Sequence, residues 1–189
     1  MSLKLSKINR GLVLLIAAVL GVVIYLTIDK IDSGKKIKEV RSLANEIITL
    51  SKDSFTFDRD VLGNGSYLDL TELGAGFPTH VSEEDIGKKI EKLKPYLFED
   101  EVLYKEIADL GFEFAEQAYN SHGCLVKEIT SRTPSKIKVN YYNNTASVTI
   151  YVHNEIITKE STADSIDSTD VLLFEYTGGR WVLVSYEIY

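Results

Sequence analysis

The sequence predicts an α+β fold: an N-terminal transmembrane helix, followed by helices packed on a curved antiparallel sheet of four to five strands. The first supporting observation is an uncharged run of eighteen residues, GLVLLIAAVLGVVIYLTI, at positions 11–28. The second is a change of hydrophobic period at Gly123, from helical spacing before it to alternation after it. Helices that precede a group of strands in this way indicate helices covering one face of a sheet.

The uncharged run 11–28 has the length of a membrane-spanning helix. At about 1.5 Å per residue it extends about 27 Å, close to the ~30 Å hydrocarbon core of a bilayer, where backbone groups must bond within a helix. Lys4, Lys7 and Arg10 precede it without an acidic residue, which predicts a cytoplasmic N-terminus. We therefore expect a basic stub (1–10), a single-pass helix in the cell membrane (11–28), a linker (29–34) and an extracytoplasmic cone-like domain (35–189).

Two other interpretations of the same run stay open. A cleaved signal peptide has a shorter apolar region that ends in small residues, whereas this run ends in YLTI. Arg10 and Gly11 before a long apolar helix resemble the leader of type IV pilin-like proteins, which is cut after the glycine. That resemblance implies a mature N-terminus at Leu12 and one continuous helix to about residue 52, although Ile16 stands where those proteins carry an acid.

Charge and cysteine content restrict the function. All 28 acidic residues follow residue 28, together with 18 of the 21 basic ones, so this part carries a net charge of about −10. Such a surface does not suit nucleic acid or anionic lipid headgroups. The single cysteine, Cys124, cannot form an internal disulfide, so the domain depends on its hydrophobic core. The lack of disulfides is more typical of a bacterial envelope protein than of a small eukaryotic ectodomain.

Three helices and four or five strands are expected after the linker. The helices are 35–52, with a break before it at Gly34; 82–95, which starts at a capping-box-like segment; and 99–120, which stops at Gly123. The segment 53–79 between the first two is glycine-rich and irregular, and we expect it to carry a functional loop. The expected strands are 125–132, 136–142, 145–157, 171–176 and 180–188. Turns are expected at Asn143-Asn144 and Gly178-Gly179, and a polar loop at 159–169.

No catalytic, cofactor-binding or metal-binding motif stands out in the sequence. Three histidines match no metal-ligand spacing: His80, His122 and His153. Three aspartates recur every third residue between serines: Asp164, Asp167 and Asp170. Their oxygens suit calcium, but the closing glutamate of a calcium loop is missing, so a solvated loop is expected. An acid facing a pocket, such as Asp53 or Asp170, keeps a small enzymatic or ligand-binding domain open as an alternative.

Tyrosines are concentrated in the strand region, and four are candidates for binding a protein partner: Tyr142, Tyr151, Tyr176 and Tyr186. Tyrosine is enriched in protein interfaces. It is also an ordinary strand former, so a place in the core or on the sheet surface stays open for each of them.

The closing hairpin, 172–186, has the sequence LLFEYTGGRWVLVSY. With three helices before a curved sheet, this ending resembles the nuclear transport factor 2-like (cystatin-like cone) superfamily, in which a glycine turn, a tryptophan and alternating apolar residues close the chain. With the basic stub and one membrane helix, the plan is similar to bitopic assembly components of bacterial type IV secretion and conjugation systems. The resemblance implies a non-catalytic interaction or scaffold module that binds a protein partner or self-associates. The alternatives are a pilin-like filament subunit and a small-ligand-binding or enzymatic cone domain.

Overall fold

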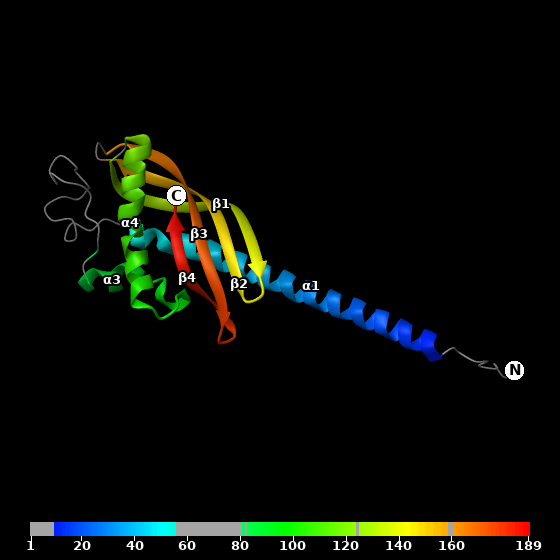
Figure 1. Ribbon diagram of the computed structural model, residues 1–189. Coiled ribbons are helices and arrows are strands. Elements are labelled where there is room, and N and C mark those ends of the chain that lie inside the picture. The colour runs from blue at the N-terminus through cyan, green and yellow to red at the C-terminus, as the bar shows by residue number, and fades with distance from the viewer. Residues whose placement is uncertain (1–9, 56–80, 82, 124, 159–160) are drawn as a thin grey trace. The chain divides into compact units, whose positions relative to one another are not determined.

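The computed structural model describes residues 10–55, 81, 83–123, 125–158 and 161–189 (Figure 1). The chain falls into two compact units, Met1–Lys38 and Glu39–Tyr189. The helices are α1 (Arg10–Leu50), α3 (Glu83–Ile90) and α4 (Glu101–His122), with short 3₁₀ helices η1 (Ser51–Phe55) and η2 (Lys94–Tyr96). The strands are β1 (Val126–Tyr142), β2 (Thr145–Thr158), β3 (Ala163–Thr177) and β4 (Arg180–Ile188). Helices followed by an antiparallel sheet confirm the predicted α+β class.

Helix α1 is one uninterrupted helix of 41 residues. The expected break at Gly34 is therefore wrong. Asp32 does not cap a new helix but forms an i,i+4 ion pair with Lys36, with 3.3 Å between Oδ2 and Nζ. A glycine inside a helix costs only about 1 kcal/mol relative to alanine. The helical hydrogen bonds of the flanking turns outweigh that cost.

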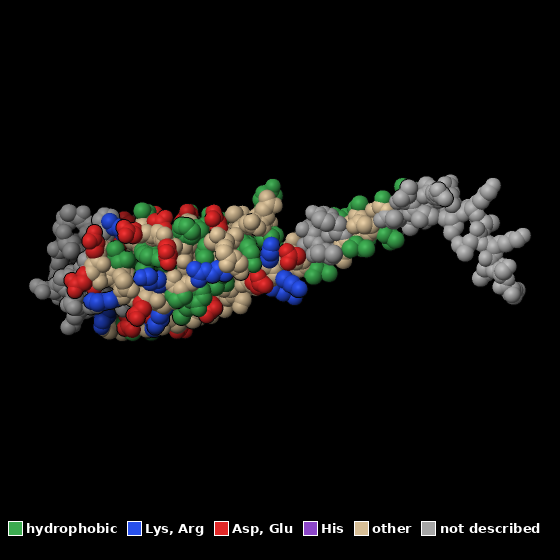
Figure 2. All heavy atoms as spheres, turned by 90° about the horizontal axis from the view of Figure 1, so that it is seen from below, with side chains coloured by type: hydrophobic (Ala, Val, Ile, Leu, Met, Phe, Trp, Pro, Cys, Tyr) green, Lys and Arg blue, Asp and Glu red, His purple; other side chains and the backbone are tan. Residues whose placement is uncertain are grey.

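Large apolar side chains of α1 in the first unit are exposed to solvent (Figure 2). They are Leu15, Val19, Leu20, Val22, Val23, Ile24, Leu26 and Ile31. Within the described residues, none of the helices combines sufficient length and hydropathy to span a bilayer. The segment 11–28, expected to do so, includes side chains outside the described residues, at positions 11–14, 16, 17, 25 and 28.

The second unit is built on one antiparallel sheet whose strands lie in chain order, β1-β2-β3-β4 (Figure 1). The two expected turns are confirmed: Asn143 has φ 54°, and Gly178 and Gly179 have φ 59° and 83°, as tight hairpins that follow the twist of the sheet require. Two strands are longer than expected. The expected strands 125–132 and 136–142 are one strand, because β1 runs through Pro134, which an edge strand tolerates. β3 begins at Ala163, so most of the expected polar loop is strand.

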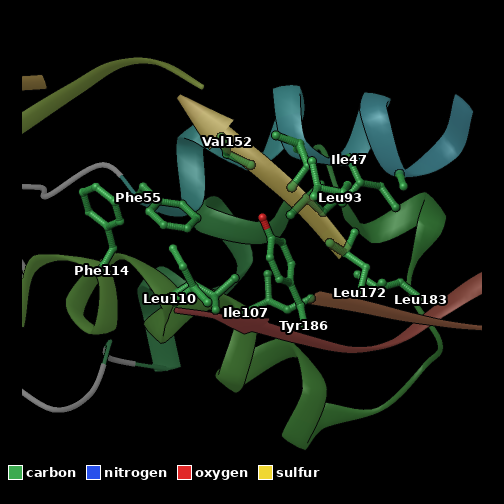
Figure 3. Close-up of a cluster of buried hydrophobic side chains, with 14 of the residues drawn as sticks. Ile47, Phe55, Leu93, Ile107, Leu110, Phe114, Val152, Leu172, Leu183 and Tyr186 are labelled. Atoms are coloured by element: carbon green, nitrogen blue, oxygen red, sulfur yellow. The ribbon is translucent and has the colours of Figure 1, made fainter. Parts of the chain in front are cut away.

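The core lies between the inner face of this sheet and the helices (Figure 3). Its largest fully buried side chains include Phe55, Phe114, Phe174, Ile47, Ile107 and Leu110. Helix α4 begins at Asp100, whose carboxylate accepts hydrogen bonds from the N–H groups of Val102 and Leu103, and it ends at Gly123 as predicted. Gly111 lets α4 cross η1 closely, because a Cβ there would lie 2.8 Å from the carbonyl oxygen of Ser54.

Candidate functional site

One buried ion pair occupies the inner face of the sheet. Arg132 of β1 and Asp170 of β3 lie 2.7 Å apart between Nη2 and Oδ2, and both side chains are fully buried. Strand β2 separates β1 from β3, and its Asn154 is paired in register with Arg132. The Nε of Arg132 donates to the side-chain oxygen of Asn154 at 2.9 Å, so the guanidinium is held above the middle of the sheet.

Further hydroxyl groups complete this network of hydrogen bonds. Nη1 of Arg132 donates to the hydroxyl of Tyr186 on β4 at 2.8 Å and to Oγ of Ser51 on η1 at 2.7 Å. The Tyr186 hydroxyl donates to Asp170 at 2.6 Å, and Ser168 donates to its other oxygen at 2.8 Å. We call these residues, with Asn154, the arginine network. It joins all four strands to the turn that follows α1.

The electrostatics of the network hold Arg132 charged and Tyr186 neutral. Burial is the largest influence on the pKa of Arg132 and lowers it, but Tyr186 and Asp170 together outweigh it, so the pKa is raised. Burial, assisted by Asp170 and opposed by Arg132, raises the pKa of Tyr186 well above its usual range. The ring of Phe55 covers the guanidinium, with 3.8 Å between Cζ and the ring centroid, which adds a cation–π contact.

Asp170 and Asp53, the two acids considered as groups that could face a pocket, lie in different places: one in the interior and one at the surface. Asp170 does point into the interior, but Arg132, Tyr186 and Ser168 occupy its oxygens. Asp53 lies on the surface and forms an ion pair with Lys92 at 2.7 Å. A hollow of about 60 Å³ between α4 and β3 reaches Ser168. It has room for a few waters rather than for the ligands that fill typical binding pockets.

The four candidate tyrosines do not share one surface. Tyr142 and Tyr151 are 75% and 51% exposed, and both lie on the outer face of the sheet, which the described helices leave uncovered. Tyr176 is half-buried and packs against Trp181, with 5.2 Å between ring centroids. Tyr186 is only 4% exposed and belongs to the arginine network (Figure 3), so in this structure it is not on a surface where a partner could reach it.

A β-bulge explains why Tyr186 turns inward. Leu173 pairs with Ser185 but Phe174 pairs with Leu183, so Val184 is an extra residue in β4. The extra residue reverses the alternation of side chains. Trp181 and Leu183 before the bulge, and Tyr186 after it, therefore all face the core. Simple alternation along the sequence would place Tyr186 on the opposite face from Leu183.

Among the described residues, the remaining candidates do not gather into a metal site. The described histidines are His122, at the end of α4, and His153, whose Nδ1 lies 2.8 Å from Asp167 on the outer face. His80 and Cys124 lie outside the described residues. The aspartate series is part of β3, with Asp164 exposed. Across the described ranges, no three potential ligand side chains gather to hold a metal ion.

The outer sheet face is the exposed surface of the four strands, opposite the helices. On β2 and β3 its central residues are uncharged: Ser147, Thr149, Tyr151, Thr169, Val171 and Leu173. Lys136 and Lys138 lie on the β1 side, whereas Glu175 and Glu187 lie toward β4. Leu173 is 38% exposed. Around these residues the face therefore combines a low-charge centre with two lysines on one side and two glutamates on the other, which suits contact with another protein.

Comparisons with known proteins show similarity in structure only. No protein-family model and no curated protein matches the chain. Among solved structures, the chain is similar to the association domain of CaMKII from C. elegans, with 19% identity and a TM-score of 0.35 over 56% of this chain and 84% of that one. It is also similar to a nuclear transport factor 2-like superfamily protein from Salmonella enterica serovar Typhimurium, with 13% identity and a TM-score of 0.35 over 56% and 80%. The second belongs to the superfamily that the closing hairpin resembles, but TM-scores this low establish no function.

Proposed function

We propose that this protein is a membrane-anchored, non-catalytic interaction module of a bacterial envelope assembly, and that the outer sheet face is its binding surface. The main observation that supports this proposal is the contrast between the two sides of the sheet. On the inner side, the strongest polar groups are buried and bonded to one another around Arg132 and Asp170. On the outer side, uncharged side chains such as Val171 and Leu173 stay partly exposed, and none of the described helices covers them.

Site-specific photo-crosslinking tests the interaction surface. A photoreactive phenylalanine analogue at Leu173 is expected to give one discrete crosslinked species in intact membranes. The same analogue at Glu116, an exposed position on α4, is the matched control and is expected to give none. Equal crosslinking at both positions, or none at Leu173, would refute the assignment of the outer sheet face.

The anchor rests on the apolar run 11–28 and the exposed apolar side chains of α1. Alkaline carbonate extraction of cell membranes is expected to leave the full-length protein in the pellet. A Leu20→Lys, Ile24→Lys double variant is expected to be extracted, because a charge at the centre of a spanning helix costs about 2.5–3.5 kcal/mol by insertion scales. Recovery of the unaltered protein in the soluble fraction would contradict the anchor. Protease added from outside tests the predicted extracytoplasmic location of the second unit.

A pilin-like filament subunit is a second candidate, and the uninterrupted helix α1 favours it. This function requires cleavage after Gly11 and a single helix from the membrane into the folded domain. Mass spectrometry of the protein isolated from membranes separates the two candidates. A mature chain beginning at Leu12 supports the filament subunit, and a chain that retains Lys4 and Lys7 excludes it.

A further inference from the structure

A groove lies in the second unit, where the turn between β3 and β4 comes close to η2 and α1. Its volume is about 520 Å³, within the ~300–1,000 Å³ that is usual for ligand sites. Tyr176 and Trp181 of its wall point to the same side of the sheet as the core residues Phe174 and Leu183, so the groove is separate from the outer sheet face. We call it the hairpin groove, and its lining includes Glu39, Leu43, Tyr96, Tyr176, Arg180 and Trp181.

Hydrogen bonds hold the walls of the hairpin groove in place. The hydroxyl of Tyr96 donates to a carboxylate oxygen of Glu46 on α1 at 2.7 Å. Nη1 of Arg180 donates to the carbonyl oxygen of Pro95 at 3.0 Å, which joins the start of β4 to η2. A ligand therefore meets a groove that is already formed, and binding does not have to order its walls.

The indole N–H of Trp181 is the unusual group in this wall. In the part of the chain that the structure describes, it is the one buried side-chain polar group without a hydrogen-bond partner. Its ring contacts Tyr176 and Tyr141 edge to face, with centroids 5.2 Å and 6.0 Å away, and an aromatic face is only a weak acceptor. Tyr176 is half-buried, so a rotation of its ring would open the indole N–H to a carbonyl oxygen in the groove.

The lining offers aromatic faces and donors but few side-chain acceptors. Glu46 already accepts from Tyr96, and the carbonyl of Pro95 already accepts from Arg180. A peptide with many N–H groups would find few partners for them in such a groove. Proline has no N–H, and a polyproline II helix has no internal hydrogen bonds, so its carbonyl oxygens stay free to accept. The lining therefore suits a proline-rich peptide better than other extended chains.

We propose that the hairpin groove binds a proline-rich segment of a protein partner, with prolines against Tyr96 and Tyr176 and a carbonyl oxygen bonded to Nε1 of Trp181. Aromatic-lined grooves bind such segments because the polyproline II helix is already extended and loses little entropy. Glu39 is exposed at the α1 side of the groove, so a basic residue beside the prolines is favoured. This site goes beyond the proposed function, which rests on the opposite face of the sheet.

Trp181 supplies a direct probe, because it is the only tryptophan in the chain. In the ¹⁵N-labelled full-length protein in detergent micelles, its indole N–H gives one cross-peak in a proton–nitrogen correlation spectrum. The ligand used is a blocked synthetic peptide, Arg-Ala-Leu-Pro-Pro-Leu-Pro-Pro-Ala, and the control peptide has every proline replaced by alanine. The proline peptide is expected to move the cross-peak downfield in a saturable way, as a new hydrogen bond does. The alanine peptide is expected to leave it in place.

Variants test the individual contacts, with affinity for the proline peptide measured by isothermal titration calorimetry. Trp181→Phe keeps an aromatic ring but removes the N–H, and it is expected to raise the dissociation constant about tenfold, as loss of one hydrogen bond does. Tyr96→Ala removes an aromatic face and is expected to raise it by about the same factor. Glu39→Gln is expected to raise it about threefold at low salt. Tyr151→Ala, at an exposed tyrosine of the outer sheet face, is the matched control and should leave it unchanged.

Each outcome supports or overturns the hairpin groove as a peptide site. Equal affinity for the two peptides, no binding of either, or saturable binding that leaves the Trp181 cross-peak in place would overturn it. Circular dichroism checks the fold of each variant, and if Trp181→Phe is unfolded, Tyr96→Ala decides. Peptide binding without a crosslink at Leu173 would retain this inference and remove the proposed function of the outer sheet face. A crosslink at Leu173 without peptide binding would do the opposite.

Discussion

The arginine network makes a strong prediction about stability. Asp170 is fully buried, and its carboxylate accepts hydrogen bonds from Arg132, Tyr186 and Ser168. Asp170→Asn keeps the shape of the side chain but removes its charge, which leaves the Arg132 guanidinium buried without a counter-ion. Breaking a buried pair in this way costs about 3–5 kcal/mol. That is a large part of the ~5–15 kcal/mol that stabilises an ordinary domain.

Removing both charges is expected to be less harmful than the sum of the single changes. Arg132→Met alone leaves the Asp170 carboxylate buried, again at a cost of about 3–5 kcal/mol. The double variant, Arg132→Met with Asp170→Asn, buries no charge, and we expect it to lose only about 2–4 kcal/mol. The difference from additivity corresponds to a coupling energy of about 5 kcal/mol at the middle of these ranges and about 2 kcal/mol at least, compared with about 0.3–0.5 kcal/mol of scatter for independent sites.

Urea unfolding of the full-length protein, followed by tryptophan fluorescence, measures these energies. Trp181 is the only tryptophan in the chain and lies in the core, so its emission reports the loss of packing around the sheet. The exposed pair Asp53–Lys92 is the matched control, and its coupling is expected to be small and to disappear in salt. Additive single changes at Arg132 and Asp170 would refute the interpretation of the network as one unit.

Three further predictions follow from the same structure, each measured by urea unfolding. Because the folded pKa of Tyr186 is raised above 10, stability is fully present below pH 10 and is lost at higher pH, by up to about 1.4 kcal/mol per pH unit; Tyr186→Phe should remove this component. Gly111→Ala should destabilise by about 1–3 kcal/mol because its Cβ would meet Ser54, whereas Gly87→Ala in α3, with open space around it, should stabilise by about 0.5–1 kcal/mol. Asp100→Ala should cost about 0.5–2 kcal/mol by removing the cap of α4. A stabilised Gly111→Ala variant would contradict the close approach of α4 to η1.

Features set by neighbouring residues could be predicted from the sequence. The turn at Asn143 and the stop of α4 at Gly123 depend on positive φ angles that these residue types adopt at low cost. The alternation in β2 and the apolar stripe of α4 needed no knowledge of the rest of the fold. The break at Gly34 was wrong for a local reason as well, since Asp32 is equally suited to cap a helix or to pair with Lys36.

The arginine network could not be predicted, because its members are brought together only by strand register. Arg132 and Asp170 are 38 residues apart, and the sequence placed Asp170 in a solvated loop with Asp164 and Asp167. One signal was present: Ile166 and Leu172 lie an even number of residues from Asp170, so in a strand all three side chains point to the same face. The inward turn of Tyr186 had no such signal, since the bulge at Val184 is defined by its pairing with β3.

The placement of the network suggests what a buried ion pair contributes to this domain. Apolar side chains of similar size are often as stabilising as a buried ion pair, so stability alone does not explain it. Hydrogen bonds are directional, however, and those of Arg132 fix Ser51, at the end of α1, against β1 and β4. An apolar core would resist separation of the helix from the sheet but not a small slide between them. The network therefore holds the four strands in one register and fixes the turn after α1 against them.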